Sequence, residues 1–81
     1  MKAYQRKVTV EIRPDGSPRQ LYWEGRAYPV QVVLDRWRAG GRWWQGEEIR
    51  DCYLVQAGPL VAELHHEAGS GGTWWLARLQ D

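Results

Sequence analysis

The sequence lacks several residue types, and each absence narrows what the chain can be. It contains no Phe, no Asn and only one Cys, Cys52, among 81 residues. A single Cys excludes an internal disulfide and fits a reducing compartment. No apolar stretch approaches the roughly 20 residues of a membrane-spanning helix, and residues 1–10 alternate charged and apolar side chains instead of forming a signal peptide. We therefore expect a cytoplasmic protein without a membrane segment.

The chain also lacks a strong charge of either sign. It carries 11 Lys and Arg against 10 Asp and Glu, so the formal net charge is +1. No global basic field therefore draws the chain to nucleic acid. The cations are mostly Arg, and the few thermolabile residues make the composition thermophile-like. The length predicts a single small domain, 1–81, and excludes a multi-step enzyme with its own cofactor fold.

Alternating apolar residues and frequent turn signals predict an all-β fold. The expected strands lie at 7–13, 19–23, 26–37, 48–56, 60–66 and 73–79. About six short strands with turns about every 8–12 residues are typical of a small antiparallel barrel or sandwich. Residues 60–68 also fit a short helix that begins at Pro59 and is capped by Gly69. We favour a strand there, because the glycines of 69–72 suit the loop of a hairpin.

The 26–37 segment is the longest predicted strand, and its pattern contains an irregularity. Alternate residues of its first part form one apolar face: Tyr28, Val30, Val32 and Leu34. Pro29 indicates an edge position or the start of the strand, because it lacks the N–H donor. Trp37 then falls out of phase with Leu34. This slip predicts a bulge or bend near Asp35.

Tryptophan is the residue in excess, with six in the chain. Four of them form the adjacent pairs 43–44 and 74–75. Neighbouring residues of a strand point to opposite faces, so at most one Trp of each pair enters the core. The other must be covered by a loop, a partner or a ligand. Two such pairs in one short chain indicate an interaction surface.

Arginine and tryptophan alternate around a pair of glycines, and this cluster is the predicted binding site. Arg binds phosphate and stacks, Trp offers a platform for unpaired bases, and glycine lets backbone approach a ligand. The candidate residues are Arg36, Trp37, Arg38, Gly40, Gly41, Arg42, Trp43, Trp44 and Trp74. Under the alternative, the Trp side chains close one end of the barrel, and the Arg side chains pair with Glu47, Glu48 and Asp51.

Four stretches carry a resemblance to a known family. They are Trp-Glu-Gly-Arg-Ala-Tyr at 23–28, residues 33–38 leading to Arg-Trp-Trp at 42–44, Arg-Asp-Cys-Tyr at 50–53, and residues 72–81. The chain resembles an uncharacterised small bacterial domain that occurs alone. A similar pattern ends catalytically inactive Y-family DNA polymerase homologues of the mutagenic translesion apparatus. The chain departs from the family pattern at two positions. Cys52 stands where an aromatic residue is expected, and Gln80 stands where Tyr is expected. The resemblance implies a role near DNA repair and supplies no activity.

Residues for metal binding or catalysis are sparse. His65 and His66 are adjacent, so on a strand they diverge and cannot chelate one metal, and only Cys52 could join them. Ser17 and Ser70 lie in turns that lack a nucleophile-elbow pattern. We predict no enzyme activity, no metal and no cofactor. The expected function is binding of single-stranded DNA as an accessory to repair or translesion synthesis. The alternative is a protein-interaction module for a polymerase-like partner or a second copy.

Overall fold

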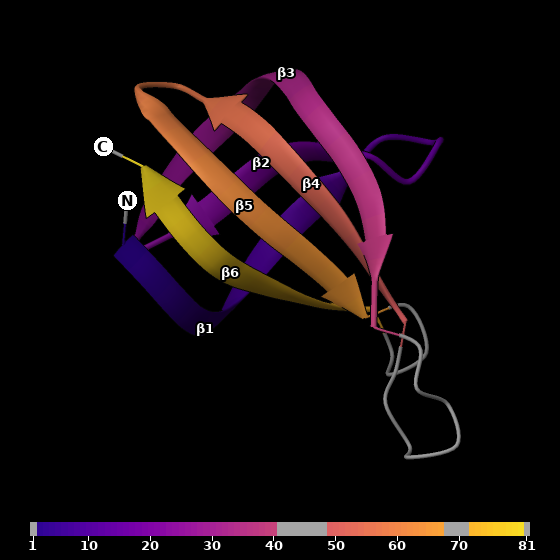
Figure 1. Cartoon of the computed structure of the whole chain (residues 1–81). Helices are drawn as coiled ribbons and strands as arrows, with labels where there is room; N and C mark the ends of the chain where they lie inside the picture. Colours follow the sequence, from indigo (N-terminus) through magenta and orange to yellow (C-terminus); the bar gives the residue numbers. More distant parts are fainter. Residues whose placement is uncertain (1, 41–48, 68–71, 81) are drawn as a thin grey trace.

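The computed structural model describes residues 2–40, 49–67 and 72–80. Within them, antiparallel strands follow one another around a closed barrel, and the last strand pairs with the first (Figure 1). The strands are β1 (Lys2–Ile12), β2 (Pro18–Trp23), β3 (Arg26–Ala39), β4 (Arg50–Ala57), β5 (Leu60–Glu67) and β6 (Thr73–Gln80). The all-β prediction is confirmed, in its barrel form. The described part of the chain has no helix that could cross a membrane.

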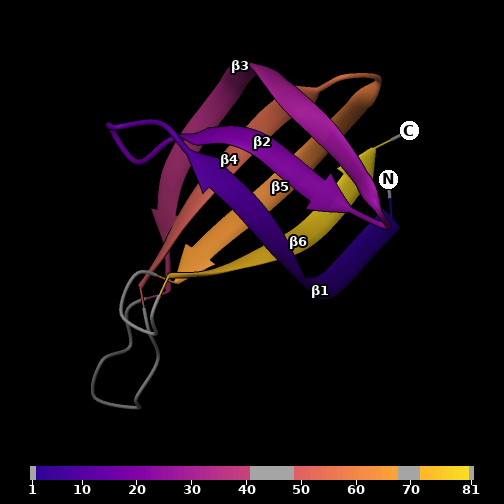
Figure 2. The same ribbon diagram turned by 180° about the vertical axis from the view of Figure 1, so that it is seen from behind.

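β1 and β3 each change partner along their length. Residues 9–12 of β1 pair with β2, whereas residues 2–8 pair with β6. Residues 26–29 of β3 pair with β2, whereas residues 30–39 pair with β4. In β3 a register shift lies at the change, between Val30 and Val32, whereas the shift of β1 between Ala3 and Arg6 lies within the part that pairs with β6. Such irregularities bend a strand, and Figure 2 shows the resulting bend of β1.

The segment with two interpretations is a strand. Residues 60–67 form β5 between β4 and β6, so the helix alternative is wrong for these residues, while residue 68 lies outside the described part. Ala57 pairs with Leu60 across a turn made by Gly58 and Pro59. Gly58 has a φ of +60°, a conformation that glycine adopts without steric cost. The inward side chains of β5, Ala62 and Leu64, are fully buried.

The predicted apolar face of β3 is wrong beyond Val30. Val30 is buried, but Val32 and Leu34 are 44% and 51% exposed, and Val33 packs against the core in their place. The register shift between Val30 and Val32 reverses which side chains point inward. A second shift between Val33 and Asp35 confirms the predicted bulge near Asp35.

Pro29 occupies neither of its predicted positions. It lies inside β3 and pairs with Gln20 of β2, and no later residue of β3 pairs with that strand. Its missing N–H therefore coincides with the point where β3 leaves β2, and a lost donor costs little there.

Aliphatic and aromatic side chains fill the barrel. The buried cluster consists of Leu21, Val30, Tyr53, Val55, Ala57, Ala62, Leu64, Trp74, Leu76 and Leu79. Val8 and Val10 of β1 pack against this cluster, so every strand contributes to it. Burial of apolar surface is the main favourable contribution to the free energy of folding in a domain of this size.

Arg13 and Asp15 order the turn between β1 and β2. The Asp15 Oδ1 atom accepts hydrogen bonds from the Ser17 backbone N–H at 2.9 Å and from the Ser17 hydroxyl at 2.6 Å. These two bonds lower the pKa of Asp15. The Arg13 guanidinium donates to the carbonyls of Pro18 and Val30. This side chain therefore bridges β2 and β3 where the two strands separate.

Glu24 and Gly25 form the turn between β2 and β3. Trp23 pairs with Arg26, and the two residues between them have φ values of +50° and +75°. Positive φ at both positions is the geometry of the type I′ turn, whose first position favours Asn, Asp or Gly. A glutamate in the left-handed region is unusual and strained.

We therefore expect Glu24→Asn to stabilise the protein. Asn tolerates the left-handed conformation better than Glu, so the free energy of unfolding should rise by about 0.5–1 kcal/mol. Urea denaturation measures this difference. Glu24→Gln keeps the side-chain length and should change stability by less than about 0.5 kcal/mol. An Asn variant that is no more stable than the wild type would contradict a strained turn.

Candidate nucleic-acid interface

One row of paired residues crosses the barrel at the end where β3 stops. Arg38 pairs with Asp51, Asp51 with His66, His66 with Trp74, and Trp74 with Val8. The row therefore runs from β3 to β1. Arg36 and Tyr53 form the next pair on the same side of β3 and β4. We call this end the basic end after its two arginines, although Asp51 also lies there; its members are Arg36, Arg38, Asp51, Tyr53, His66 and Trp74.

Two arginines of β3 lie side by side at the basic end. The Arg38 Nε atom lies 3.0 Å from the Asp51 Oδ1 atom, and the Arg38 side chain is 76% exposed. An ion pair this exposed contributes about 0–1 kcal/mol, so the guanidinium remains available to a ligand. The Arg36 guanidinium lies over the Tyr53 ring, 5.2 Å from its centroid. This cation–π contact orients Arg36 without neutralising it.

Aromatic rings continue from Tyr53 toward β5. The ring centroids of Tyr53 and Trp74 are 5.6 Å apart, and His66 stacks on Trp74 at 4.3 Å with an interplanar angle of 7°. Trp74 is only 5% exposed, so it belongs to the core and offers no open platform. His66 covers it and remains partly exposed. The exposed ring at the basic end is therefore that of His66, whereas the sequence predicts that of Trp74.

The other predicted site residues are divided. Trp37 pairs with Cys52 and so lies on the side of β3 opposite Arg36 and Arg38. Gly40 is exposed and has a φ of +87°, which favours glycine. The remaining candidates lie outside the described residues: Gly41, Arg42, Trp43 and Trp44.

The ion pair of Arg38 with Asp51 belongs to the alternative interpretation of the cluster. Glu47 and Glu48 lie outside the described residues. Arg38 is paired with Asp51, as the alternative expects, and its side chain is still largely exposed. Sequence reasoning missed Tyr53 and His66 as members of the site. Tyr53 follows Asp51 by two residues, and His66 follows Leu64 by two. This spacing places each pair on one side of its strand, and it was the available signal.

A second row crosses the outer side of the barrel. It runs through Trp37, Cys52, His65 and Trp75, each of which pairs with the next. Cys52 is fully buried although it faces outward, and the Trp75 Nε1 and His65 Nδ1 atoms are buried without hydrogen bonds. Trp74 and Trp75 thus point to opposite sides, as the strand geometry requires. The outer Trp takes part in a second, smaller packed layer.

His65 contacts a carboxylate. Its Nε2 atom lies 2.6 Å from the Glu63 Oε2 atom. Among the described residues, no group of three or more His, Cys, Asp and Glu side chains is arranged to hold a metal ion. Burial raises the pKa of the Cys52 thiol above its ordinary value of 9.0, so the thiol is not activated as a nucleophile.

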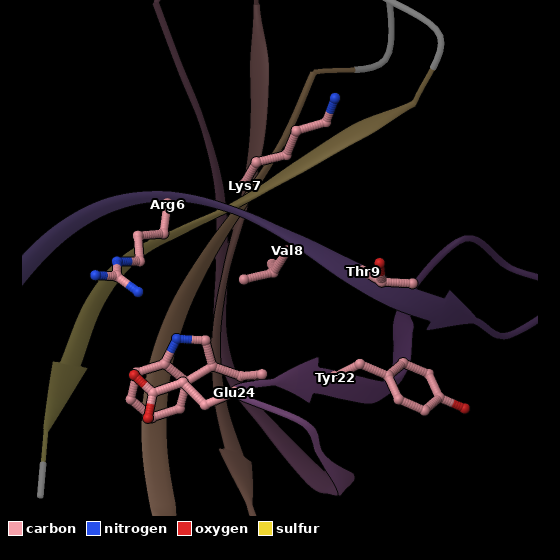
Figure 3. A pocket seen from close by; sticks show the side chains of 7 residues that line it. Arg6, Lys7, Val8, Thr9, Tyr22 and Glu24 are labelled. Carbon is pink, nitrogen blue, oxygen red and sulfur yellow. The ribbon is translucent and has the colours of Figure 1, made fainter.

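A pocket opens in the wall of the barrel and adjoins the basic end at Val8. It has a volume of about 470 Å³ and lies between β1 and the end of β2. Arg6 and Val8 of β1 and Trp23 and Glu24 at the end of β2 contribute to its lining (Figure 3). β1 pairs with β2 only from Thr9 onward, so the two strands are already apart at this point.

These features define a small antiparallel β-barrel with one basic, aromatic end and a pocket in its wall. Its sequence relationship is also clear. The chain belongs to the family described as a domain of unknown function, DUF6504, which matches residues 2–81. The expectation of a small uncharacterised domain is thereby confirmed. No curated protein and no solved structure matches the chain.

The raised pKa of Cys52 predicts a loss of stability in alkali. The native pKa lies above the unfolded value, so the stabilisation is fully present below pH 9.0 and is lost as the pH rises through the native pKa. One thiol changes the free energy of unfolding by at most about 1.4 kcal/mol per pH unit. Urea denaturation between neutral pH and alkali should show a decline that is shallower in Cys52→Ala. Equal pH profiles for both proteins would exclude this contribution.

Proposed function

We propose that this protein is a non-catalytic module that binds single-stranded nucleic acid, in particular single-stranded DNA, across the basic end of the barrel. The observation that carries the proposal is the position of Arg36 and Arg38. They are alternate residues of β3, lie on the same side of that strand and are both exposed. Alternate residues of a strand are about 7 Å apart, so the two guanidiniums can contact successive phosphates of an extended strand.

The aromatic content of the basic end favours unpaired bases over a duplex. A duplex hides the faces of its bases, whereas a single strand offers them for stacking on aromatic side chains. His66 is partly exposed and is backed by Trp74, which fixes the plane of its ring. A base that stacks on His66 would extend the existing series of rings from Tyr53 through Trp74.

The small net charge sets the strength of this binding. With a formal charge of +1, long-range attraction contributes little and affinity depends on local contacts. Two phosphate contacts give a slope of log affinity against log salt of about −1.4 for a single strand. We therefore expect weak binding that is clearest at low salt.

The resemblance to the C-terminal region of inactive Y-family polymerase homologues supports a biological setting for this activity. Bacterial translesion synthesis exposes single-stranded template next to the polymerase. A small module that holds this strand would act as an accessory to repair in the cytoplasm, without catalysis of its own.

A second candidate function is protein interaction, with a polymerase-like partner or a second copy of the chain. It is favoured by the exposure of Val32 and Leu34 on β3, beyond the point where this strand leaves β2. Among the described residues, this part of β3 pairs with β4 alone, and an exposed apolar pair beside such an edge suits β-strand addition by another chain. The second function predicts association that survives the loss of Arg36 and Arg38.

The experiment is a titration of a fluorescently labelled single-stranded oligonucleotide, followed by polarisation at low and at physiological salt. Replacing both Arg36 and Arg38 by Ala should weaken binding about tenfold at low salt and remove most of the salt dependence. Arg78→Ala removes an exposed cation of β6 and should leave binding unchanged. Absence of wild-type binding at low salt, or equal loss in the Arg78 variant, would refute this function.

A further inference from the structure

The pocket in the barrel wall has the dimensions of a small-molecule site. Its volume of about 470 Å³ lies within the range of roughly 300–1,000 Å³ typical of ligand pockets. It lies where β1 and β2 stop pairing with each other: Thr9 and Tyr22 form their last pair, and Trp23, which pairs with Arg26 of β3, lies beyond it. The closure of the barrel therefore maintains the opening without a ligand.

The pocket combines an apolar wall with charges of both signs, from Arg6, Lys7 and Glu24. Trp23 and Val8 pack against the core and supply the apolar surface. Arg6 from β1 and Glu24 from the turn lie on one side of the pocket, whereas Tyr22 lies on the other (Figure 3). Neither Arg6 nor Glu24 forms an ion pair with another residue of the described ranges, although both are exposed. Both charged groups are thus free to contact a ligand.

Glu24 occupies a backbone position that suits other residues better. Its φ of +50° places a long, non-glycine side chain in the left-handed region. Turn geometry alone would favour Asn, Asp or Gly there. Strain of this kind is concentrated at binding and catalytic sites, because the side chain has a use that offsets its cost. A carboxylate at the rim of a pocket with an aromatic wall is such a use.

We propose that this pocket binds a guanine nucleotide: Trp23 stacks on the base, Glu24 accepts from its Watson–Crick edge, and Arg6 contacts its phosphate. Guanine presents two adjacent donors, N1–H and the N2 amino group, which match the two oxygens of a carboxylate. Adenine and cytosine present a donor beside an acceptor, and thymine presents a donor between two acceptors. The carboxylate therefore selects guanine, and the guanidinium supplies attraction for the phosphate.

Two kinds of ligand carry both a guanine base and a phosphate. One is a guanine nucleotide of a single strand held at the basic end, and this assignment rests on the function proposed above. The other is a free guanosine monophosphate. Trp74 of the basic end pairs with Val8 of the pocket, so the two regions adjoin through β1 and β6. A strand that crosses the basic end would bring a nucleotide to the pocket.

Calorimetric titration with mononucleotides tests the pocket directly. The wild-type protein should bind guanosine monophosphate at least about tenfold more tightly than adenosine monophosphate. Glu24→Gln should abolish this preference, because the acceptor and donor of an amide match adenine as well as the O6 and N1–H of guanine. In a heteronuclear NMR spectrum, the indole N–H signal of Trp23, assigned with Trp23→Phe, should shift during the titration. Equal affinity for both nucleotides, or no binding, would overturn the assignment.

Three variants separate recognition from structure. Glu24→Asn should lose the guanine preference while the protein becomes more stable, an outcome that a purely structural role of Glu24 does not allow. Arg6→Ala should weaken the monophosphate about tenfold and leave guanosine unchanged, since guanosine has no phosphate. Arg78→Ala is the matched control and should behave as the wild type. Unaltered guanine selectivity in both Glu24 variants would contradict the role of the carboxylate.

Oligonucleotides distinguish a failure of the pocket from a failure of nucleic-acid binding. Tighter binding of guanine-containing single strands, lost in Glu24→Gln, supports the strand as the source. Binding of oligonucleotides without base preference, together with no binding of guanosine monophosphate, overturns the pocket and leaves the function at the basic end intact. Binding of the mononucleotide alone supports the pocket with a free nucleotide and argues against the basic end.

Discussion

The fold depends on a mismatch of strand lengths. β2 has six residues, whereas its neighbours β1 and β3 have 11 and 14. A strand of six residues spans about 20 Å, so it can pair with only part of each neighbour. The barrel closes because β1 and β3 continue beyond β2 and pair with β6 and β4. The bend of β1 leaves the pocket beside Trp23, and the bend of β3 turns Val32 and Leu34 outward.

The same closure decides which aromatic residues are available. Once β6 is paired on both sides, Trp74 must point into the barrel and Trp75 must point out. The inner ring joins Tyr53 and His66, and the outer ring joins Trp37, Cys52 and His65. A core this small gains much of its buried area from such large residues. Trp74 and Trp75 therefore serve packing, and Arg36 and Arg38 distinguish the basic end.

The sequence predicted the positions of the strands and the turns well, because alternation and glycine or proline positions are local signals. It predicted the bulge near Asp35 from the phase of Trp37, but it assigned Val32 and Leu34 to the core. That error arose from the shift next to Val30, whose cause is the length of β2 and is not local. The basic end was found in part, through Arg36 and Arg38. His66 and the pocket were missed because both depend on which strands pair across the barrel.

Glu24 links the energetics of the fold to its recognition chemistry. Turn geometry alone favours Asn or Gly at this position, and packing does not require Glu, because the side chain is exposed. A residue that opposes both local preference and stability is expected where a binding function maintains it. The apolar lining of Val8 and Trp23 gives the carboxylate surroundings in which its hydrogen bonds strengthen relative to open solvent. Strain at the turn and selectivity for donors on a base are then two consequences of one side chain.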